Sequence, residues 1–253
     1  MLTFLSLNAW QGSLRENLMD FLASKKHDVD VFCFQEVPSY TPATDEKPES
    51  KLLTELEGLL NCHKIAGFAP FGGQRRWWVL TMVSQEITVH KAREIWIHEN
   101  IGYKVPEGHH SSEMARSMMA TILETPIHGK ILVCNVHGFT EPVHGKADTP
   151  ERIRQSERIL EYVASVGLPT ILMGDFNLRA DTESVRMFVK AWFRNLIDEY
   201  GITSTRPTLV YDKPVRHADF VFLSPDFKVE SFEVLDIPVS DHCPMIVKID
   251  NHQ

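Results

Sequence analysis

A carboxylate and a carboxamide stand two residues apart where an apolar run of the sequence ends. The run Ile171–Gly174 is typical of a buried strand, and Asp175 and Asn177 follow it directly. Residues i and i+2 of an extended chain point to the same face, so the two side chains would lie side by side. A carboxylate can accept a hydrogen bond from water, and an amide can donate one to an anion. Asp and Asn also form turns, so the pair alone fits an ordinary strand exit equally well.

Five further segments place an acid, an amide or an imidazole at the edge of an apolar run. These residues are Asn8, Glu36, His137, Asp219 and the pair Asp241-His242. Taken singly, most of them fit turns, solvated strand ends or, for His137, a packed core histidine. Asp219 is harder to explain by packing, because a buried carboxylate requires a partner. The joint pattern favours function, since strands of one sandwich can converge at a common edge.

The elements that must position these residues alternate between strands and helices. Strands are predicted at Thr3–Leu7, Val29–Gln35, Trp78–Val83, Met118–Leu123, Ile131–Val136, Thr170–Met173, Asp219–Leu223 and Met245–Ile249. Helices are predicted at Ser13–Ala23, Ser50–Leu60, Pro150–Val166 and Thr182–Arg194. Asp148 or Thr149 can cap the third helix, and Gly167 suits its C-terminal exit. Many strands with helices between them predict a mixed α/β sandwich, with the polar segment Pro38–Pro48 as a surface loop.

Length, composition and charge limit the class of protein. The 253 residues are 43% hydrophobic and show no linker or repeat, so we expect one domain over residues 1–253. A formal charge of −8 argues against a broad surface that coats nucleic acid, but not against nucleic acid as a substrate. The four cysteines lie far apart without a CxxC pair, which predicts reduced core residues. With no signal peptide and no apolar run long enough for a membrane, we expect a cytoplasmic monomer.

The joint pattern resembles the endonuclease/exonuclease/phosphatase superfamily, which has the deoxyribonuclease I-like fold. The matching pieces follow the family's order and span nearly the whole chain: Leu-Asn-Ala-Trp (7–10), Phe-Gln-Glu-Val (34–37), Asn-Val-His-Gly (135–138), Gly-Asp-Phe-Asn (174–177), Ala-Asp-Phe-Val-Phe (218–222) and Ser-Asp-His (240–242). The resemblance implies a four-layered α/β sandwich, with two central, mostly antiparallel sheets flanked by helices. It places the site at one rim of the sandwich.

The resemblance also implies a role for each residue of the pattern. A hard divalent cation on carboxylate oxygens offsets the charge that makes phosphoesters slow to hydrolyse. Glu36 is the implied principal Mg²⁺ ligand, with Mn²⁺ as an alternative metal and with Asn8 and Asp241 as further ligands. Asp175 would position the attacking water, and Asn177 would donate to a phosphate oxygen.

Two histidines complete the implied chemistry. His242 would act as the base or as a phosphate-binding imidazolium, with Asp219 fixing its tautomer, and we prefer the first role. His137 is placed to protonate or stabilise the leaving oxygen. Arg116 is a candidate phosphate-binding residue, although a surface arginine fits its position as well. The segment Arg75-Arg76-Trp77-Trp78 could bind a single strand by charge and stacking, or could be an exposed loop.

Differences between this sequence and the usual pattern of one branch indicate which branches of the superfamily it is more similar to. Val37 stands where the exonuclease III branch typically has a lysine, and no tryptophan follows Trp192. The pattern is more similar to the sphingomyelinase, deadenylase and tyrosyl-DNA phosphodiesterase branches, and Glu151-Arg152 with Gln155 resembles the last of these weakly.

The activity that the resemblance implies is hydrolysis of a phosphoric ester by a metal-dependent enzyme. The leading hypothesis is a Mg²⁺-dependent phosphodiesterase of nuclease type, acting on nucleic-acid ends or on a small phosphodiester. One alternative is a phosphomonoesterase or phospholipase C-type activity on a lipid or inositol phosphate headgroup. A second alternative is a binding scaffold that keeps the fold without catalysis. The substrate would be set by the rim loops 38–50, 67–77, 98–116 and 139–149.

Overall fold

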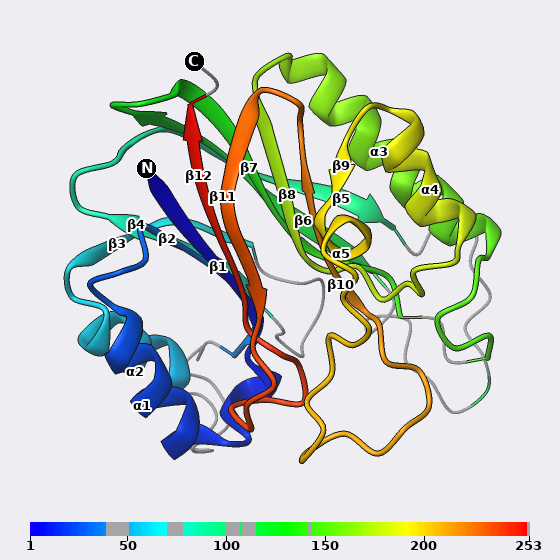
Figure 1. The fold of residues 1–253 in the computed structure, drawn as a ribbon, viewed down its shortest axis with the longest axis horizontal. Helices are drawn as coiled ribbons and strands as arrows, with labels where there is room; N and C mark the ends of the chain where they lie inside the picture. The colour runs from blue at the N-terminus through cyan, green and yellow to red at the C-terminus, as the bar shows by residue number, and fades with distance from the viewer. Residues whose placement is uncertain (39–50, 70–77, 100–106, 108–114, 141–142, 252–253) are drawn as a thin grey trace.

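Two six-stranded β-sheets pack face to face in the computed structural model, which describes residues 1–38, 51–69, 78–99, 107, 115–140 and 143–251 (Figure 1). The first sheet has the order β11 (Phe227–Val234), β12 (Met245–Asn251), β1 (Leu2–Asn8), β2 (Val31–Val37), β4 (Trp78–Ser84) and β3 (His63–Ala69). The second has the order β5 (Thr88–His98), β6 (Arg116–Thr125), β7 (Gly129–His137), β8 (Thr170–Asp175), β10 (Asp219–Leu223) and β9 (Arg194–Asn195).

Helices cover the outer face of each sheet, and this confirms the predicted four-layered sandwich (Figure 1). Helices α1 (Arg15–Lys25) and α2 (Leu52–Leu59) pack on the first sheet. Helices α3 (Pro150–Val166) and α4 (Glu183–Lys190) pack on the second. The short helices η1 (Trp10–Gly12) and α5 (Leu196–Glu199) follow β1 and β9. One pair of strands in each sheet is parallel and the other pairs are antiparallel.

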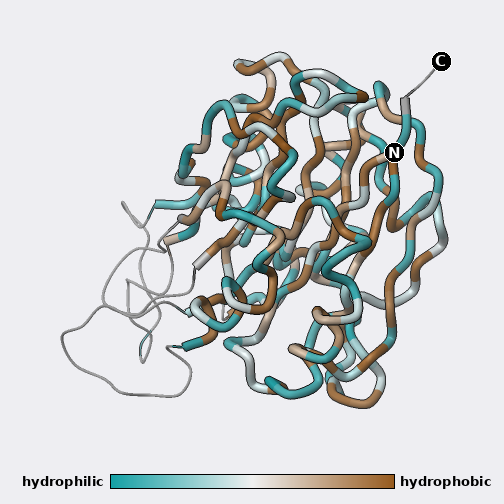
Figure 2. Tube along the Cα trace, turned by 90° about the vertical axis from the view of Figure 1, so that its left-hand side faces the viewer, coloured by the Kyte–Doolittle hydropathy of each residue, from teal (hydrophilic) through white to brown (hydrophobic). Residues whose placement is uncertain are grey.

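The central strands bury both faces, which explains their near-continuous apolar sequences. In β1, Leu2 and Phe4 join the core between the sheets, whereas Leu5 and Leu7 join the cluster under α1 and α2. This alternation follows from the two-residue period of a strand. Figure 2 shows the apolar stretches running along the strands of the sandwich. The core thus holds the ends of these strands in fixed relative positions.

The predicted elements are confirmed for the central strands and the helices, with one correction. Helix α4 was predicted to reach Arg194 but ends at Lys190, and Trp192 adopts a left-handed conformation with φ 69°. The chain then forms the short strand β9, and of the apolar residues after Lys190, Phe193 is buried whereas Trp192 is exposed. At α3, the side chain of Thr149 caps the first turn and Gly167 ends the helix with φ 63°, as predicted.

The cysteines fit the prediction of reduced core residues. All four are free; Cys33, Cys134 and Cys243 are buried and Cys62 is half-buried. The proposed loop Pro38–Pro48 lies, apart from Pro38, outside the described residues, as does Arg75–Trp77.

Candidate active site

The candidate residues converge because the carboxyl ends of parallel strands meet at one edge of each sheet. Asn8 pairs with Gln35 across β1 and β2, and His137 pairs with Asp175 across β7 and β8. Strand β10 runs antiparallel to β8, so its first residue, Asp219, lies opposite Asp175. The two edges face each other across the sandwich. They therefore bring a set of polar side chains from both sheets into one place.

Two glycines allow the strands of the second sheet to approach closely beside the site. A Cβ atom on Gly174, where φ is 139°, would lie 2.1 Å from the carbonyl oxygen of Val136. A Cβ atom on Gly138 would lie 2.1 Å from the carbonyl oxygen of Phe176. No real Cβ contact is this short, so any side chain here would separate β7 from β8. The spacing of His137 and Asp175 depends on this close approach.

A backbone irregularity directs Glu36 toward the edge. Its φ is 56°, a left-handed conformation that costs a residue with a side chain about 1–3 kcal/mol. The pairing of β2 with β4 shifts register between Phe34 and Val37, which marks a bulge. In a regular strand, Glu36 would share the outward face of Phe32 and Phe34, which pack under α1 and α2. The bulge instead brings its carboxylate to Asn8.

Asn8 links the acids of the two sheets. Its Nδ2 atom donates to Glu36 Oε1 at 3.1 Å and to Asp175 Oδ2 at 3.2 Å. Its Oδ1 atom accepts from the backbone N–H of Trp10 at 3.0 Å. In this arrangement the amide nitrogen, and not the oxygen, faces the carboxylates. Asn8 is therefore placed to hold the two acids in position.

His242 lies between two carboxylates. Its Nδ1 atom is 2.7 and 2.9 Å from the two oxygens of Asp219, and its Nε2 atom is 3.6 Å from Asp175 Oδ2. Thr205 donates its hydroxyl to Asp219 Oδ2 at 2.8 Å. Ser240 ties this segment to β1, because its hydroxyl donates to the carbonyl of Asn8 and accepts from the N–H of His242. The imidazole is thus oriented from both sides.

Electrostatics separates the protonation states of these neighbours. Burial alone would lower the pKa of His242, but the carboxylates of Asp219 and Asp175 together outweigh it and the pKa is raised. Burial alone would raise the pKa of Asp175, yet the charges of Lys146 and His242 hold it well below its usual range. The arrangement therefore favours an imidazolium at His242 beside an ionised Asp175.

His137 differs from His242 although both are buried. Burial, reinforced by the charge of Arg116, lowers the pKa of His137 to about 3, so its ring is neutral near pH 7. Its Nε2 atom lies 3.7 Å from Glu36 Oε1. Burial also raises the pKa of Glu36, and the charges of Asp175 and Asp241 add to this rise. A neutral His137 can still donate one N–H to a developing negative charge.

Asn177 is held by both ends of its amide. Its Nδ2 atom donates to the carbonyl of Gly138 at 3.1 Å, and its Oδ1 atom accepts from Lys146 Nζ at 2.8 Å. Its backbone N–H donates to Asp175 Oδ1 at 2.8 Å, which the left-handed φ of 56° makes possible. One amide hydrogen remains after the bond to Gly138. This hydrogen can be donated to an oxygen of a bound anion.

Comparison with known proteins agrees with this arrangement. The model of the endonuclease/exonuclease/phosphatase family matches residues 5–242. The chain belongs to this family. A comparison with curated proteins found no match.

Several solved structures share the fold of this chain at low sequence identity. A family protein from Bacteroides thetaiotaomicron is 20% identical with a TM-score of 0.76, over 100% of this chain and 98% of that one. A mannosyl-6-phosphatase from the same organism is 20% identical with a TM-score of 0.72, over 98% and 99% of the two chains. The catalytic domain of human nocturnin with bound sulfate is 16% identical with a TM-score of 0.70, over 99% and 94%.

In this family member, Asp241 is paired within the chain. Arg206 Nη1 donates to Asp241 Oδ2 at 2.8 Å and to its carbonyl at 2.9 Å. The Arg206 side chain is 5% exposed, and its guanidinium stacks on the ring of Tyr211 with Cζ 4.6 Å from the ring centroid. Asp241 Oδ1 lies 3.8 Å from His242 Nε2. Arg206 therefore fixes one oxygen of Asp241 and leaves the other beside the imidazole.

Arg116 lies at the site but makes contacts within the chain. Its Nε atom donates to the carbonyl of Gly138 and its Nη2 atom to Thr140 Oγ1, each at 3.0 Å. These bonds hold the segment after β7 beside Asn177. The structure places its charge near His137, and its role in binding phosphate stays a prediction.

The carboxylates gathered at the site could bind a hard divalent cation, which would offset their negative charges. Burial is the main cause of the raised pKa of Glu36, and the negative charges of Asp175 and Asp241 raise it further. Oxygen ligands of this kind are those that Mg²⁺ and Mn²⁺ prefer. Asp175, Asp219 and His242 also lie within 4.8 Å of one another through potential ligand atoms. However, Asp219 is already bonded to His242 and Thr205, so that group is better explained as an oriented histidine.

Sequence reasoning missed several residues of this site. Thr205 and Arg206 stand in a polar run, Ser204–Thr208, that carries no strand or helix pattern, so only their proximity to Asp219 in the sequence could have indicated them. Lys146 lies in the rim loop 139–149 with no local signal. Segments 39–50, 70–77, 100–106, 108–114 and 141–142 of the predicted rim loops lie outside the described residues.

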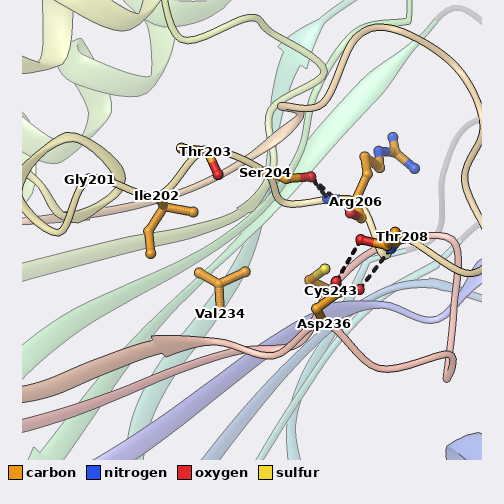
Figure 3. Close-up of a pocket in the computed structure, with 9 residues that line it drawn as sticks. All are labelled: Gly201, Ile202, Thr203, Ser204, Arg206, Thr208, Val234, Asp236 and Cys243. Atoms are coloured by element: carbon orange, nitrogen blue, oxygen red, sulfur yellow. Dashed lines mark hydrogen bonds between the residues drawn. The ribbon is translucent and has the colours of Figure 1, made fainter.

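A separate pocket lies behind Arg206. It is lined by Gly201, Ile202, Thr203, Ser204, Arg206, Thr208, Val234, Asp236 and Cys243 (Figure 3). The Arg206 guanidinium points away from the other lining side chains, and Thr208 closes one side by bonding to Asp236. None of the predicted site residues lines this pocket. It therefore borders the candidate active site without forming part of it.

Among the described residues, no helix is long and apolar enough to cross a membrane.

Proposed function

We propose that this chain is a metal-dependent phosphodiesterase that hydrolyses a phosphoester bond with an activated water molecule. The observation that carries the proposal is the bridge from Asn8 to Glu36 and Asp175, which joins acids of two sheets beside His242. Membership of a family of nucleases and phosphatases supports the same reaction class.

Two acids would hold the metal in this proposal. Glu36, with a side chain 20% exposed, would be the principal ligand, and Asp241 would contribute the oxygen that Arg206 leaves free of its ion pair. When bound, Mg²⁺ or Mn²⁺ would polarise a phosphoryl oxygen and offset charge in the transition state. Asn8 would keep Glu36 and Asp175 at their spacing.

The histidines would take different parts. The raised pKa of His242 favours an imidazolium that binds a phosphate oxygen over the role of general base. Asp175, ionised and 2% exposed, would orient the attacking water by accepting its hydrogen bond. Asn177 and neutral His137 would donate to oxygens on which negative charge grows.

A chromogenic aryl phosphodiester tests the proposal. We expect hydrolysis with Mg²⁺ or Mn²⁺, loss on addition of EDTA, and losses of about 100-fold or more in Glu36→Ala and His242→Ala. Glu233→Ala, which removes an exposed carboxylate on β11, is the matched control. Activity that survives both substitutions and EDTA would show that another site or mechanism is responsible.

A phosphomonoesterase is the second candidate. The positive charges of Lys146 and Arg206 both lower the pKa of Asp175, so two cations lie near the position that a dianionic terminal phosphate would occupy. One structural neighbour is a mannosyl-6-phosphatase. Parallel assays of DNA, RNA, inositol phosphates, a phospholipid and a sugar phosphate would distinguish the candidates. A binding scaffold without catalysis would show neither Mg²⁺ binding nor turnover on any of these substrates.

A further inference from the structure

Lys146 is a charged group at the site to which the phosphodiesterase proposal gives no role. It is half-buried, and its Nζ atom donates to Asn177 Oδ1 at 2.8 Å. Among the described residues, this is the one hydrogen bond that the ammonium donates, although an ammonium group has three donors. Its charge acts on Asp175 and His137. The ammonium therefore lies beside the amide that is proposed to contact the substrate.

The backbone on both sides of Lys146 is fixed. The carbonyls of Gly145 and Ala147 accept from the guanidinium of Arg152, a side chain with no exposed surface. The carbonyl of Lys146 itself accepts from the backbone N–H of Arg179 at 3.1 Å. Three consecutive carbonyls are thus bonded to other parts of the chain. A surface loop held in this way presents its side chain in a set direction.

The rest of the loop is anchored to the helices. Asp148 accepts from the backbone N–H groups of Glu183 and Ser184 at the start of α4. Gln155 of α3 accepts from the backbone N–H of Phe139 at 2.6 Å. Arg152 and Gln155 belong to the segment that weakly resembles the tyrosyl-DNA phosphodiesterase branch. In this structure they hold the loop that carries Lys146. Burying the Arg152 guanidinium costs desolvation energy, and its hydrogen bonds to the carbonyls of Gly145 and Ala147 offset part of that cost.

We propose that Lys146 binds a non-bridging oxygen of the substrate's phosphoryl group, beside Asn177. This inference rests on the proposed function, because it assigns a residue to the same site. An ammonium interacts more strongly with a dianionic terminal phosphate than with a monoanionic diester. Lys146 therefore binds a terminal phosphate more strongly than an internal one, whichever of the two the enzyme hydrolyses.

Three substitutions separate charge from hydrogen bonding. Lys146→Arg keeps the charge, Lys146→Gln keeps a donor for Asn177 without the charge, and Lys146→Met removes both. We expect Lys146→Arg to stay within about 3-fold of the wild type in kcat/KM, and Lys146→Gln and Lys146→Met to lose about 10- to 100-fold. The loss should be larger for an aryl phosphomonoester than for an aryl phosphodiester. Lys190→Met, an exposed lysine paired with Glu183, is the control.

Two kinetic outcomes would overturn the proposal. Full activity of Lys146→Gln would mean that the lysine only orients the Asn177 amide. If Lys146→Met loses the same factor in kcat/KM on the aryl phosphomonoester and on the aryl phosphodiester, Lys146 does not favour a terminal phosphate.

A labelling experiment tests the residue without relying on turnover. Acetic anhydride would modify Lys146 and Lys190, and mass spectrometry would quantify both. We expect inorganic phosphate with Mg²⁺ to protect Lys146 but not Lys190, compared with chloride at equal ionic strength. Equal labelling of Lys146 in phosphate and in chloride would overturn the proposal. If the wild type hydrolyses neither ester while phosphate protects Lys146, the proposed function fails and phosphate binding by Lys146 stands.

Discussion

The Nδ1 atom of His242 lies 2.7 Å from one carboxylate oxygen of Asp219 and 2.9 Å from the other. Both side chains are buried, and the histidine comes from the segment before β12 of the first sheet, whereas the aspartate begins β10 of the second. The pair thus joins the two sheets at the rim. Because Thr205 also donates to Asp219, the carboxylate is held while the imidazole ring is oriented toward Asp175.

Asp219→Asn should lower the pKa of His242, because the Asp219 carboxylate is the largest charge that raises it. Activity should fall about 100-fold or more, since the ring loses both its charge and its orientation. An NMR titration of the His242 ring protons in EDTA would measure the pKa directly. Asp236→Asn, which changes an exposed carboxylate bound to Thr208, is the control. An unchanged His242 pKa in Asp219→Asn would show that other groups set it.

A second link between the sheets lies beneath the site. Gln35 Nε2 donates to Asn135 Oδ1 at 2.7 Å, and Asn135 Nδ2 donates to the carbonyls of Phe34 and Leu80. Gln35 and Asn135 have no exposed surface, and they precede Glu36 and His137 by one and two residues. This buried link is placed to set the distance between those two site residues.

Asn135→Ala should destabilise the fold by at least about 2 kcal/mol, because it leaves several buried polar groups without partners. Activity per folded molecule should also fall, since the spacing of Glu36 and His137 is no longer fixed. Urea denaturation and kinetics at a temperature where the variant is folded would measure the two effects. Asn17→Ala removes an exposed bond to the carbonyl of Pro238 and should change stability by less than about 0.5 kcal/mol. Equal stability of the two variants would contradict a supporting role for Asn135.

The strands that the sequence did not reveal have a common position. They are β3, β5, β9 and β11, and these are the edge strands of the two sheets. Most side chains of β5 are exposed, and β9 has two residues, so neither shows an apolar run. Interior strands are buried on both faces and were predicted because such runs are continuous. A run of apolar residues thus predicts a buried strand. Edge strands that are partly exposed to solvent lack such a run, so the sequence does not predict them.

The site residues that the sequence predicts are likewise those next to buried strands. Residues such as Asp175 and Asp219 could be predicted because they end or begin buried strands. Lys146 and Arg206 could not, since their positions depend on loops whose course is set by distant contacts such as that of Arg152 with Gly145. The left-handed backbone of Glu36 was also not predictable, because no glycine or turn sequence marks the bulge.

Gly174→Ala should destabilise the protein strongly, by about 3 kcal/mol or more, because the new Cβ would overlap the carbonyl oxygen of Val136. Asp175 follows directly, so activity should be lost as well. Gly58→Ala is the matched control: it lies inside α2 and its Cβ would meet nothing within 4 Å. That change should stabilise the protein by about 0.5–1 kcal/mol through helix propensity. Thermal denaturation of both variants checks the contrast, and a Gly174→Ala protein as stable as the wild type would refute the close approach.

Buried neutral histidines should make the fold sensitive to acid, and His98 allows this to be tested outside the proposed metal ligands. Burial lowers its pKa to about 4, and its ring stacks on Phe139 with centroids 4.0 Å apart. An ordinary histidine in the unfolded chain has a pKa near 6.5, so between about pH 6.5 and 4 the unfolded state binds more protons. Stability is therefore greatest above pH 6.5 and falls as the pH falls toward 4.

His98→Phe should keep the stacking and remove this proton linkage. Between pH 7.5 and 5.0 the wild type should lose about 2 kcal/mol more stability than the variant, because each pH unit below 6.5 costs about 1.4 kcal/mol for one such histidine. Urea denaturation at the two pH values, with EDTA present, measures the difference. His27→Phe, at an exposed position, should leave the pH dependence of the wild type unchanged. A His98→Phe protein with the same acid sensitivity as the wild type would show that His98 is protonated in the fold, and the loss of stability would then have to come from other groups, with buried His137 the first to examine.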